Sequence, residues 1–354
     1  MSSSKWLSRR LKMGVQITDL LIRHIIKIED LAGKKLAVDA FNTIYQFLTT
    51  IRQRDGTPLM DSKGRVTSHL TGLFSRTTKL MGYDIKLCFV FDGKPPELKE
   101  MESKRRRERK EEAGIKHKAA IEKKDIEEMK KYAARTAYLT DEMIEESKEL
   151  IDALGLPIVQ APSEGEAQAA LMVKKGDVWA VVSQDTDSLL FGADILVRNL
   201  SISGRRKKTS KLAYETVQPE LVKLKENLDT LGINQEQLIA LAILVGTDYN
   251  PGGVKGIGPK KGLQLVKEYE TDFDKMFKKV GWDFPFKWTE PFNVIKKMPT
   301  IKDYKLKWKD LDRDKVIEIL CKRHDFDKQR ILKKLNDLEK EKKKKQQKGL
   351  GEWF

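Results

Sequence analysis

Acidic residues end three short apolar segments, where they could form a metal site. The segments are Lys35–Asp39, Lys86–Asp92 and Val178–Asp185. Apolar runs of this length, rich in β-branched and aromatic residues, are typical of strands buried on both faces of a parallel sheet. Ligands of such sheets bind outside the carboxyl ends of the strands. We therefore expect Asp39, Asp92 and Asp185 to converge on one site.

Four further acidic residues lie at the ends of predicted elements. One residue separates Glu164 from Glu166, and one residue separates Asp185 from Asp187. In an extended chain, residues i and i+2 point to the same side, so each pair can present two carboxylates to one space. Asp248 comes shortly after an apolar helical segment. The expected set of carboxylates is therefore Asp39, Asp92, Glu164, Glu166, Asp185, Asp187 and Asp248.

A cluster of carboxylates favours a divalent cation, because unneutralised carboxylates at close range repel one another. The chain has two cysteines and four scattered histidines, which argues against a zinc site and for a hard ion held by oxygen. Mg²⁺ suits carboxylates and substrate phosphate, with Mn²⁺ as a substitute. Two such ions ~3.5–4 Å apart can hydrolyse a phosphodiester. The residues thus predict a two-metal nuclease, although any one aspartate could instead be the N-cap of the following helix.

The charge of the chain favours a polyanionic partner. Lys and Arg number 69 against 53 Asp and Glu, a net charge of +16, and nucleic acid is the commonest partner of such proteins. The alternative is a basic protein without this partner. The longest apolar stretch, Leu238–Val245, is too short to span a bilayer. The N-terminal residues lack the apolar core of a secretory signal, so we expect a cytoplasmic protein with no membrane contact.

The elements that must position these residues alternate between strands and helices. Helical patterns cover Thr140–Leu154, which Gly155 and Pro157 end, and about Gln235–Val245. Residues 195–217 alternate as in a β-hairpin, with Ser203–Gly204 as the turn. The predicted fold class is α/β, with a mostly parallel central sheet flanked by helices.

Six motifs make the chain resemble the flap endonucleases, structure-specific 5′ nucleases of DNA replication and repair, and the archaeal members in particular. The motifs are Val38-Asp-Ala40 with Tyr45-Gln-Phe47, Val90-Phe-Asp-Gly-Lys-Pro-Pro96, Ala161-Pro-Ser-Glu-Gly-Glu-Ala167, Gln184-Asp-Thr-Asp-Ser188, Gly246-Thr-Asp-Tyr249 and Gly256-Ile-Gly-Pro-Lys260. The resemblance implies that the seven carboxylates bind two Mg²⁺ ions. It also implies cleavage of 5′ flaps, with 5′–3′ exonuclease activity, in Okazaki fragment maturation and repair.

The resemblance implies further catalytic residues beside the metals. Lys99 and Arg106 would stand at the base of a helical arch and steer the scissile phosphate, and their spacing places both on one helix face. The charged stretch from about Glu97 to Lys131 would form that arch, where the free 5′ end passes; the alternative is a solvated helix pair without a substrate role. Tyr45 would stack on the displaced nucleotide, or else be an ordinary core aromatic.

Other motifs imply contacts with duplex DNA and with a sliding clamp. The glycine-rich segment resembles a helix–two-turn–helix element with a K⁺ ion, in which glycines let backbone N–H groups approach a phosphate. The duplex-contacting residues implied are Gly256, Gly258, Lys260, Lys261, Arg52 and Arg76, although each arginine alone is also an ordinary surface residue. The clamp-binding peptide for PCNA comprises Gln347, Leu350, Trp353 and Phe354. An internally docked tail is the alternative.

These inferences give an expected domain organisation. Residues 1–12 form an N-terminal extension, 13–335 the nuclease domain, and 336–354 a flexible tail. The nuclease domain comprises an N-terminal part (13–112), the arch (about 95–135) and an internal part (136–270). In the family the chain begins at the glycine equivalent to Gly14, near the active site, so residues 1–12 are either a mis-assigned start or an extension that passes away from the DNA.

The expected protein is a monomer that acts on branched DNA with a 5′ flap. Two alternatives stay open. The first is a junction-resolving or excision-repair nuclease of the same superfamily, although the short interval between Asp92 and Glu164 argues against the excision-repair type. The second is a non-catalytic, clamp-bound DNA-binding protein.

Overall fold

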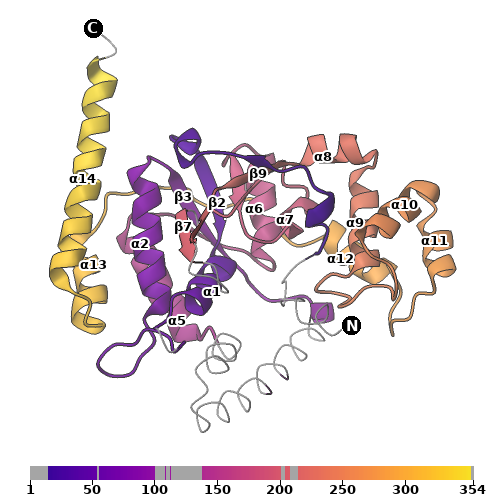
Figure 1. The fold of residues 1–354 in the computed structure, drawn as a ribbon, viewed down its shortest axis with the longest axis horizontal. Helices are drawn as coiled ribbons and strands as arrows, with labels where there is room; N and C mark the ends of the chain where they lie inside the picture. Colours follow the sequence, from indigo (N-terminus) through magenta and orange to yellow (C-terminus); the bar gives the residue numbers. More distant parts are fainter. Residues whose placement is uncertain are drawn as a thin grey trace.

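A seven-stranded, mostly parallel sheet lies at the centre of the described fold (Figure 1). The computed structural model describes residues 15–53, 56–99, 108, 112, 138–200, 204–207 and 214–351. The strands, in order across the sheet, are β1 (His24–Ile25), β9 (Glu220–Lys223), β6 (Ile195–Arg198), β5 (Ala180–Val182), β2 (Lys35–Asp39), β3 (Lys86–Phe91) and β4 (Ile158–Gln160). Strands β6 to β4 are parallel, and β9 runs antiparallel to both β6 and β1.

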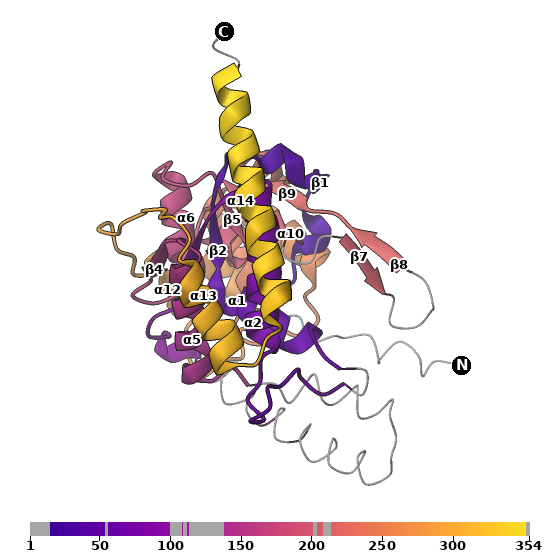
Figure 2. The same cartoon turned by 90° about the vertical axis from the view of Figure 1, so that its left-hand side faces the viewer.

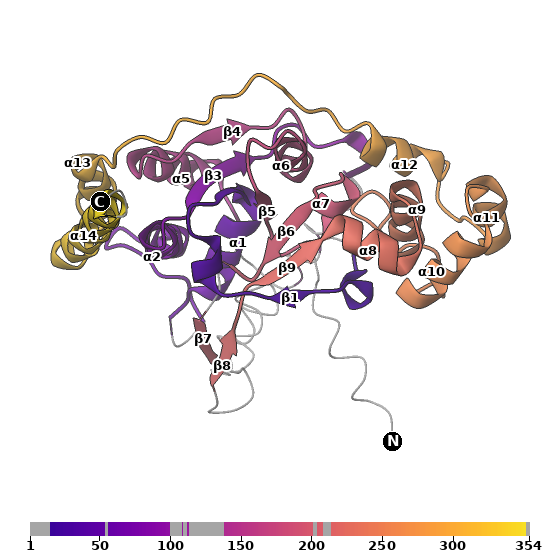
Figure 3. The ribbon, with the colours of Figure 1, turned by 90° about the horizontal axis from the view of Figure 1, so that it is seen from above.

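Helices cover both faces of this sheet (Figure 3). On one face lie α1 (Ala40–Thr50), α2 (Ser68–Gly82) and α5 (Asp141–Ala153), and on the other α6 (Gly165–Lys174) and α7 (Asp187–Leu190). Leu36 and Val38 of β2 belong to the first core and Ala37 to the second, because successive strand residues point to opposite faces. The predicted α/β class is confirmed.

Two groups of helices extend the sheet at its ends (Figures 1 and 3). At one end lie α8 (Leu224–Leu231), α9 (Gln235–Val245), α10 (Pro259–Glu268), α11 (Phe273–Val280) and α12 (Thr289–Lys296). At the other end lie α13 (Arg313–Ile317), the π-helical turn η5 (Glu318–Arg323) and α14 (Lys328–Gly351). None of the described helices is by itself long and apolar enough to cross a membrane; α8 and α9 pass that test only as a pair bent by 80°.

Several predicted elements are confirmed. The segment Lys35–Asp39 is β2, and the predicted helix Gln235–Val245 is α9, which begins with a capping box formed by Asn234 and Gln237. The helix predicted from Thr140 is α5, and the Thr140 side chain caps it by accepting a hydrogen bond from the Met143 N–H.

The predicted hairpin over residues 195–217 was wrong. Strand β6 lies inside the main sheet, between β5 and β9, and the hairpin is formed instead by β7 (Gly204–Lys207) and β8 (Tyr214–Val217) (Figure 2). Gly204 pairs with Val217, so it is part of a strand and not a turn. The adjacent residues Leu196 and Val197 point to opposite faces of the sheet and are both buried, so β6 is covered on both faces.

The tail also differs from the expected flexible tether. Helix α14 continues through this segment to Gly351 and projects beyond the sheet (Figure 2). Lysine, glutamate and glutamine have high helix propensities, and no glycine or proline interrupts them between Lys328 and Lys348. Leu335 is the last residue of α14 that is buried among the described side chains.

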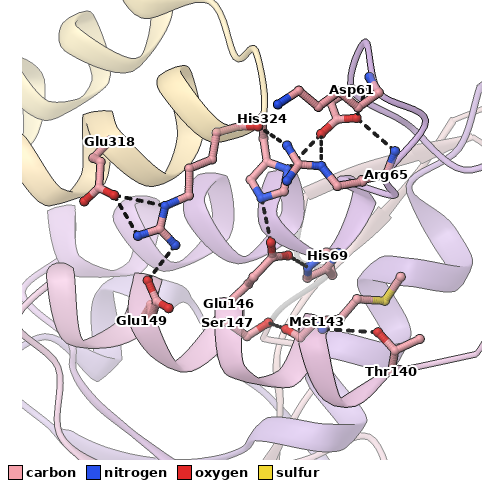
Figure 4. A network of polar contacts seen from close by, with 12 residues as sticks. Asp61, Arg65, His69, Thr140, Met143, Glu146, Ser147, Glu149, Glu318 and His324 are labelled. Atoms are coloured by element: carbon pink, nitrogen blue, oxygen red, sulfur yellow. Dashed lines mark hydrogen bonds and ion pairs between the residues drawn. The ribbon is translucent and has the colours of Figure 1, made fainter.

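A buried polar network attaches the C-terminal helices to the rest of the fold (Figure 4). His324, which follows η5, lies between two carboxylates: its Nε2 is 2.8 Å from Glu146 Oε1 on α5, and its Nδ1 is 3.1 Å from Asp61 Oδ2. Arg65 holds Asp61 from the other side at 2.8 Å. The ring of His69 lies 3.6 Å from Glu146. The network therefore joins α2, α5, the loop before α2 and the C-terminal segment.

Replacing His324 with alanine is expected to lower the free energy of unfolding by about 3 kcal/mol, because it leaves the Glu146 and Asp61 carboxylates inside the protein without this partner. Denaturant unfolding measures the effect. The matched control is His24→Ala, which removes an exposed pair with Glu226 at 2.8 Å and should cost less than about 1 kcal/mol. Equal losses in the two variants would contradict this account of the network.

Candidate active site

The seven predicted carboxylates lie at the carboxyl edge of the sheet or at adjoining helix ends. Asp39 ends β2, Asp92 follows β3 and Asp185 follows β5. Glu164 and Glu166 flank the start of α6, Asp187 begins α7, and Asp248 follows α9. Electrostatic interactions connect the whole set, for example Asp92 with Glu164 and Asp248, and Asp39 with Asp185 and Glu166. The structure thus brings the seven residues together. The strand ends predicted this for Asp39, Asp92 and Asp185.

Hydrogen bonds from the chain hold several of these side chains in place. The backbone N–H of Val15 donates to Asp187 Oδ1 at 2.8 Å, and that of Gly165 donates to Asp92 Oδ1 at 2.6 Å. Asp39 is indeed the N-cap of α1, since its Oδ1 accepts from the Asn42 N–H at 3.1 Å. The cap and the site are therefore compatible functions of one side chain, which keeps its second oxygen for the cluster.

The surroundings of Asp92 leave no room for a side chain at position 165. A Cβ added to Gly165 would lie 2.6 Å from Asp92 Oδ1, closer than real Cβ contacts come. Only glycine therefore lets the first turn of α6 approach this carboxylate closely enough to donate its N–H.

Burial and mutual repulsion make the cluster electrostatically costly. Burial, and then the charge of Asp92, raises the pKa of Asp39 to about 7. Burial with repulsion from Glu164 raises the pKa of Asp92 to about 6, and burial with repulsion from Asp248 raises that of Asp187 to about 7. The pKa values of Glu166 and Asp185 are also raised well above the ordinary range by burial and then by Asp187. Oxygen donors so arranged fit a hard divalent cation, which would offset the repulsion.

Lys99 is a basic residue that lies among these carboxylates. It ends the short helix η3 (Glu97–Lys99), and its Nζ lies 2.6 Å from Glu164 Oε2 and 3.6 Å from Asp248 Oδ2. Burial opposes its charge, but these two carboxylates outweigh burial and raise the pKa of Lys99. Among the described residues, no three His, Cys, Asp or Glu are arranged around a point that could hold a metal ion.

The spacing of residues along the chain did not predict two polar residues of the cluster, Asn42 and Ser183. Asn42 donates from Nδ2 to Asp185 Oδ2 at 2.6 Å. The buried Ser183 hydroxyl lies 3.1 Å from Glu166 Oε1 and 3.3 Å from Asp39 Oδ2. The three-residue spacing from Asp39 could have predicted the backbone bond of Asn42. Nothing in the sequence indicates its side-chain contact with a residue 143 positions away.

The other predicted site residues lie farther out or outside the described residues. Tyr45 is half-buried on α1, and Arg76 is half-buried on α2. Arg52 donates to the backbone oxygens of Thr49 and Gly56 at 3.1 and 2.9 Å, so it braces the loop after α1. Arg106 and most of the expected arch lie outside the described residues, as do Trp353 and Phe354. The backbone at Gln347 and Leu350 belongs to α14.

The glycine-rich segment has the local geometry that its residues predict. Gly256 has a φ of +79°, which L side chains rarely adopt. Gly258 is the N-cap of α10, and Pro259 occupies the first turn. Lys260 and Lys261 are exposed in that turn. Backbone N–H groups and two ammonium groups therefore face solvent at one helix N-terminus.

Comparisons with known proteins give consistent matches. A family model described as XPG N-terminal domain matches residues 13–113, and one described as XPG I-region matches residues 155–248. Flap endonuclease 1 of Pyrococcus abyssi is 54% identical over 97% of the chain and 98% of its own length. Flap endonuclease 1 of Staphylothermus marinus is 51% identical over 97% and 100%. The solved structure of flap endonuclease-1 from Methanococcus jannaschii is 46% identical, covers 94% of this chain and 100% of its own, and has a TM-score of 0.73.

Proposed function

The chain belongs to the flap endonuclease 1 family, and from this premise we propose that its seven clustered carboxylates bind two Mg²⁺ ions for cutting 5′ flaps. It is a structure-specific nuclease that acts on branched DNA in replication and repair, with associated 5′–3′ exonuclease activity. The metal proposal rests on one observation: buried carboxylates that repel one another converge at one edge of the sheet. A protein that binds no cation gains nothing from this arrangement.

The residues that would hold the ions are Asp39, Asp92, Glu164, Glu166, Asp185, Asp187 and Asp248. When bound, two such ions supply an activated water and stabilise the charge of the leaving oxygen in phosphodiester hydrolysis. The backbone of the chain orients two of these ligands. The Val15 N–H donates to one oxygen of Asp187, and the Gly165 N–H donates to one oxygen of Asp92. Each of these carboxylates keeps its second oxygen available, as in other sites where outer hydrogen bonds orient the ligands.

We propose that the Lys99 ammonium binds and steers the scissile phosphate. Its ammonium already lies within the cluster, and the oxygens it contacts belong to two proposed metal ligands, Glu164 and Asp248. With Glu164 and Asp248 engaged as metal ligands, the Lys99 ammonium would be left to bind the negatively charged phosphate. Arg106 would act beside it from the arch, and Tyr45 would stack on the displaced nucleotide.

Product mapping tests this function. End-labelled flap, bubble and four-way-junction DNA are incubated with the protein in Mg²⁺ and, separately, in EDTA. We expect cleavage near the base of the 5′ flap, dependent on Mg²⁺, and slower cleavage of the other two substrates. Preferential, symmetric cutting of the four-way junction would favour a junction-resolving enzyme, and the absence of Mg²⁺-dependent cleavage would favour a non-catalytic DNA-binding protein.

We propose that the N-terminus of α10 binds the phosphate backbone of the duplex away from the cut, together with a K⁺ ion. Replacing both Lys260 and Lys261 with alanine is expected to weaken duplex binding and to reduce the slope of log K against log salt by about 2, because two phosphate contacts are lost. Fluorescence anisotropy over a salt series measures this slope.

The control for the lysine variant is Lys309→Ala, which removes one positive charge away from α10, where Lys309 pairs with Asp152 at 2.9 Å. Its salt slope should match that of the wild type. A double lysine variant with an unchanged slope would exclude α10 from the DNA interface.

The C-terminal peptide is proposed to recruit the protein to the sliding clamp (PCNA), with Gln347, Leu350, Trp353 and Phe354 as its contacts. One helical turn would present Leu350 and the two aromatics to an apolar pocket. Helix α14, whose backbone includes Gln347 and Leu350, projects beyond the sheet (Figure 2). We propose that the protein acts as a monomer and that the clamp supplies the second attachment to DNA.

A further inference from the structure

Asn42 contacts two of the seven carboxylates. Its backbone N–H donates to Asp39 Oδ1 at 3.1 Å, and its side-chain Nδ2 donates to Asp185 Oδ2 at 2.6 Å. Asp39 lies at the end of β2 and Asp185 lies beyond the end of β5, the strand beside it in the sheet. One residue in the first turn of α1 therefore connects carboxylates that two neighbouring strands supply.

The amide of Asn42 is chemically suited to this position. Its amide nitrogen faces Asp185 Oδ2, and a carboxylate that is ionised to hold a cation can only accept hydrogen bonds. The amide is neutral and adds no charge to a cluster whose members already repel one another. A lysine or arginine here would compete with a bound cation for Asp185, whereas the amide orients one oxygen and leaves the other free.

The backbone contact makes the side-chain contact rigid. The Asn42 N–H is fixed by the Asp39 cap, and α1 packs on the sheet through Ile44 and Phe47, which are buried. The amide of Asn42 consequently starts from a fixed backbone when it reaches Asp185. Asp185 itself follows β5 in an irregular segment, and its N–H donates to Ser183 Oγ at 3.2 Å.

We propose that Asn42 is a positioning residue that fixes Asp185 relative to Asp39, and so sets the affinity of the carboxylate cluster for divalent cations. This inference rests on the proposed metal-dependent function. The contacts of Asn42 on which this role rests are those with Asp39 and Asp185, so it acts through the carboxylates. Loss of such outer hydrogen bonds typically weakens metal binding about 10–100-fold.

The test measures Mn²⁺ binding to the full-length protein without DNA, from the disappearance of the electron paramagnetic resonance signal of free Mn²⁺. Asn42→Ala removes the amide, and Asn42→Leu removes the donor while keeping a side chain of similar size. Both alanine and leucine favour helices, so α1 is expected to persist. We expect about 10-fold weaker Mn²⁺ binding in both variants.

The matched control is Asn227→Ala. Asn227 is a buried asparagine whose Oδ1 accepts from the Ile22 N–H at 2.7 Å, and it makes no contact with the cluster. Its loss should lower the thermal stability and leave Mn²⁺ binding unchanged. Both Asn42 variants should show the opposite pattern, with weaker Mn²⁺ binding and nearly unchanged stability.

The outcomes separate this inference from the proposed function. If the wild type binds Mn²⁺ and both Asn42 variants bind it equally well, the positioning role is wrong and the metal site stands. Weaker binding in the alanine variant but not in the leucine variant would show that Asn42 only fills space, which also overturns the inference. If the wild type neither binds Mn²⁺ nor cuts a flap, the proposed function itself fails.

Discussion

Replacing Asp185 with alanine is expected to reduce the rate of 5′-flap cleavage by on the order of 10³-fold or more, because the cluster loses a carboxylate that we propose as a metal ligand. Single-turnover cleavage of a labelled flap in Mg²⁺ measures the effect. DNA affinity should change little, because contacts between basic residues and phosphates dominate it in a protein of net charge +16.

The stability of the Asp185→Ala variant should equal or exceed that of the wild type without metal. Burial and the charges of Asp187 and Asp39 raise the pKa of Asp185, so its ionised form is disfavoured in the folded protein. Removing it relieves this repulsion and the cost of burial, which outweigh the lost hydrogen bond from Asn42 Nδ2. A large loss of thermal stability would mean that any lost activity reports on folding instead of on metal binding.

The control for this variant is Asp194→Ala. Asp194 is an exposed aspartate just before β6, and none of the carboxylates of the cluster is among the groups that it contacts in the described structure. It should retain full activity. Undiminished cleavage by Asp185→Ala would remove Asp185 from the proposed ligand set.

Replacing Lys99 with alanine is expected to slow flap cleavage about 100-fold at saturating DNA, as the removal of one donor to a developing charge typically does. Lys99→Arg, which keeps the charge but changes its shape and reach, should recover only part of this rate. Single-turnover rates, measured across a range of Mg²⁺ concentrations, separate the chemical step from metal binding.

The Mg²⁺ dependence distinguishes two functions of Lys99. Its ammonium contacts Glu164 at 2.6 Å and Asp248 at 3.6 Å, so removing it takes one competing cation away from each carboxylate. The Mg²⁺ concentration at half-maximal rate should therefore stay the same or fall while the maximal rate decreases. A higher Mg²⁺ requirement with an unchanged maximal rate would show that Lys99 organises the ligands instead of acting on the phosphate. Lys94→Ala removes a nearby exposed lysine and should behave as the wild type.

Local sequence patterns predicted much of the fold because they follow local physics. The run Lys35–Asp39 has the composition of a doubly covered strand, and it is β2. The shared edge of parallel strands then predicted that Asp39, Asp92 and Asp185 would meet. The hairpin failed for the opposite reason: the partner of a strand depends on the whole sheet, and β6 pairs with β5 and β9.

In the candidate site, too, local sequence could not predict contacts between side chains from distant parts of the chain. Residue type and position indicated the carboxylates, but not which groups hold them. Asn42 and Ser183 reach their partners across different elements, and Lys99 pairs with Glu164, which is 65 positions away. Such contacts depend on how the helices pack on the sheet, and the spacing of residues along the chain carries no information about them.

Diffraction from crystals of the full-length protein soaked in Mn²⁺, recorded at the manganese absorption edge, tests the central claim most directly. We expect two anomalous peaks among Asp39, Asp92, Glu164, Glu166, Asp185, Asp187 and Asp248, separated by roughly 3.5–4 Å. Crystals of the Asp185→Ala variant should lose one or both peaks. Well-ordered carboxylates in the wild type, with no anomalous density among them at saturating Mn²⁺, would contradict a two-metal site in this cluster.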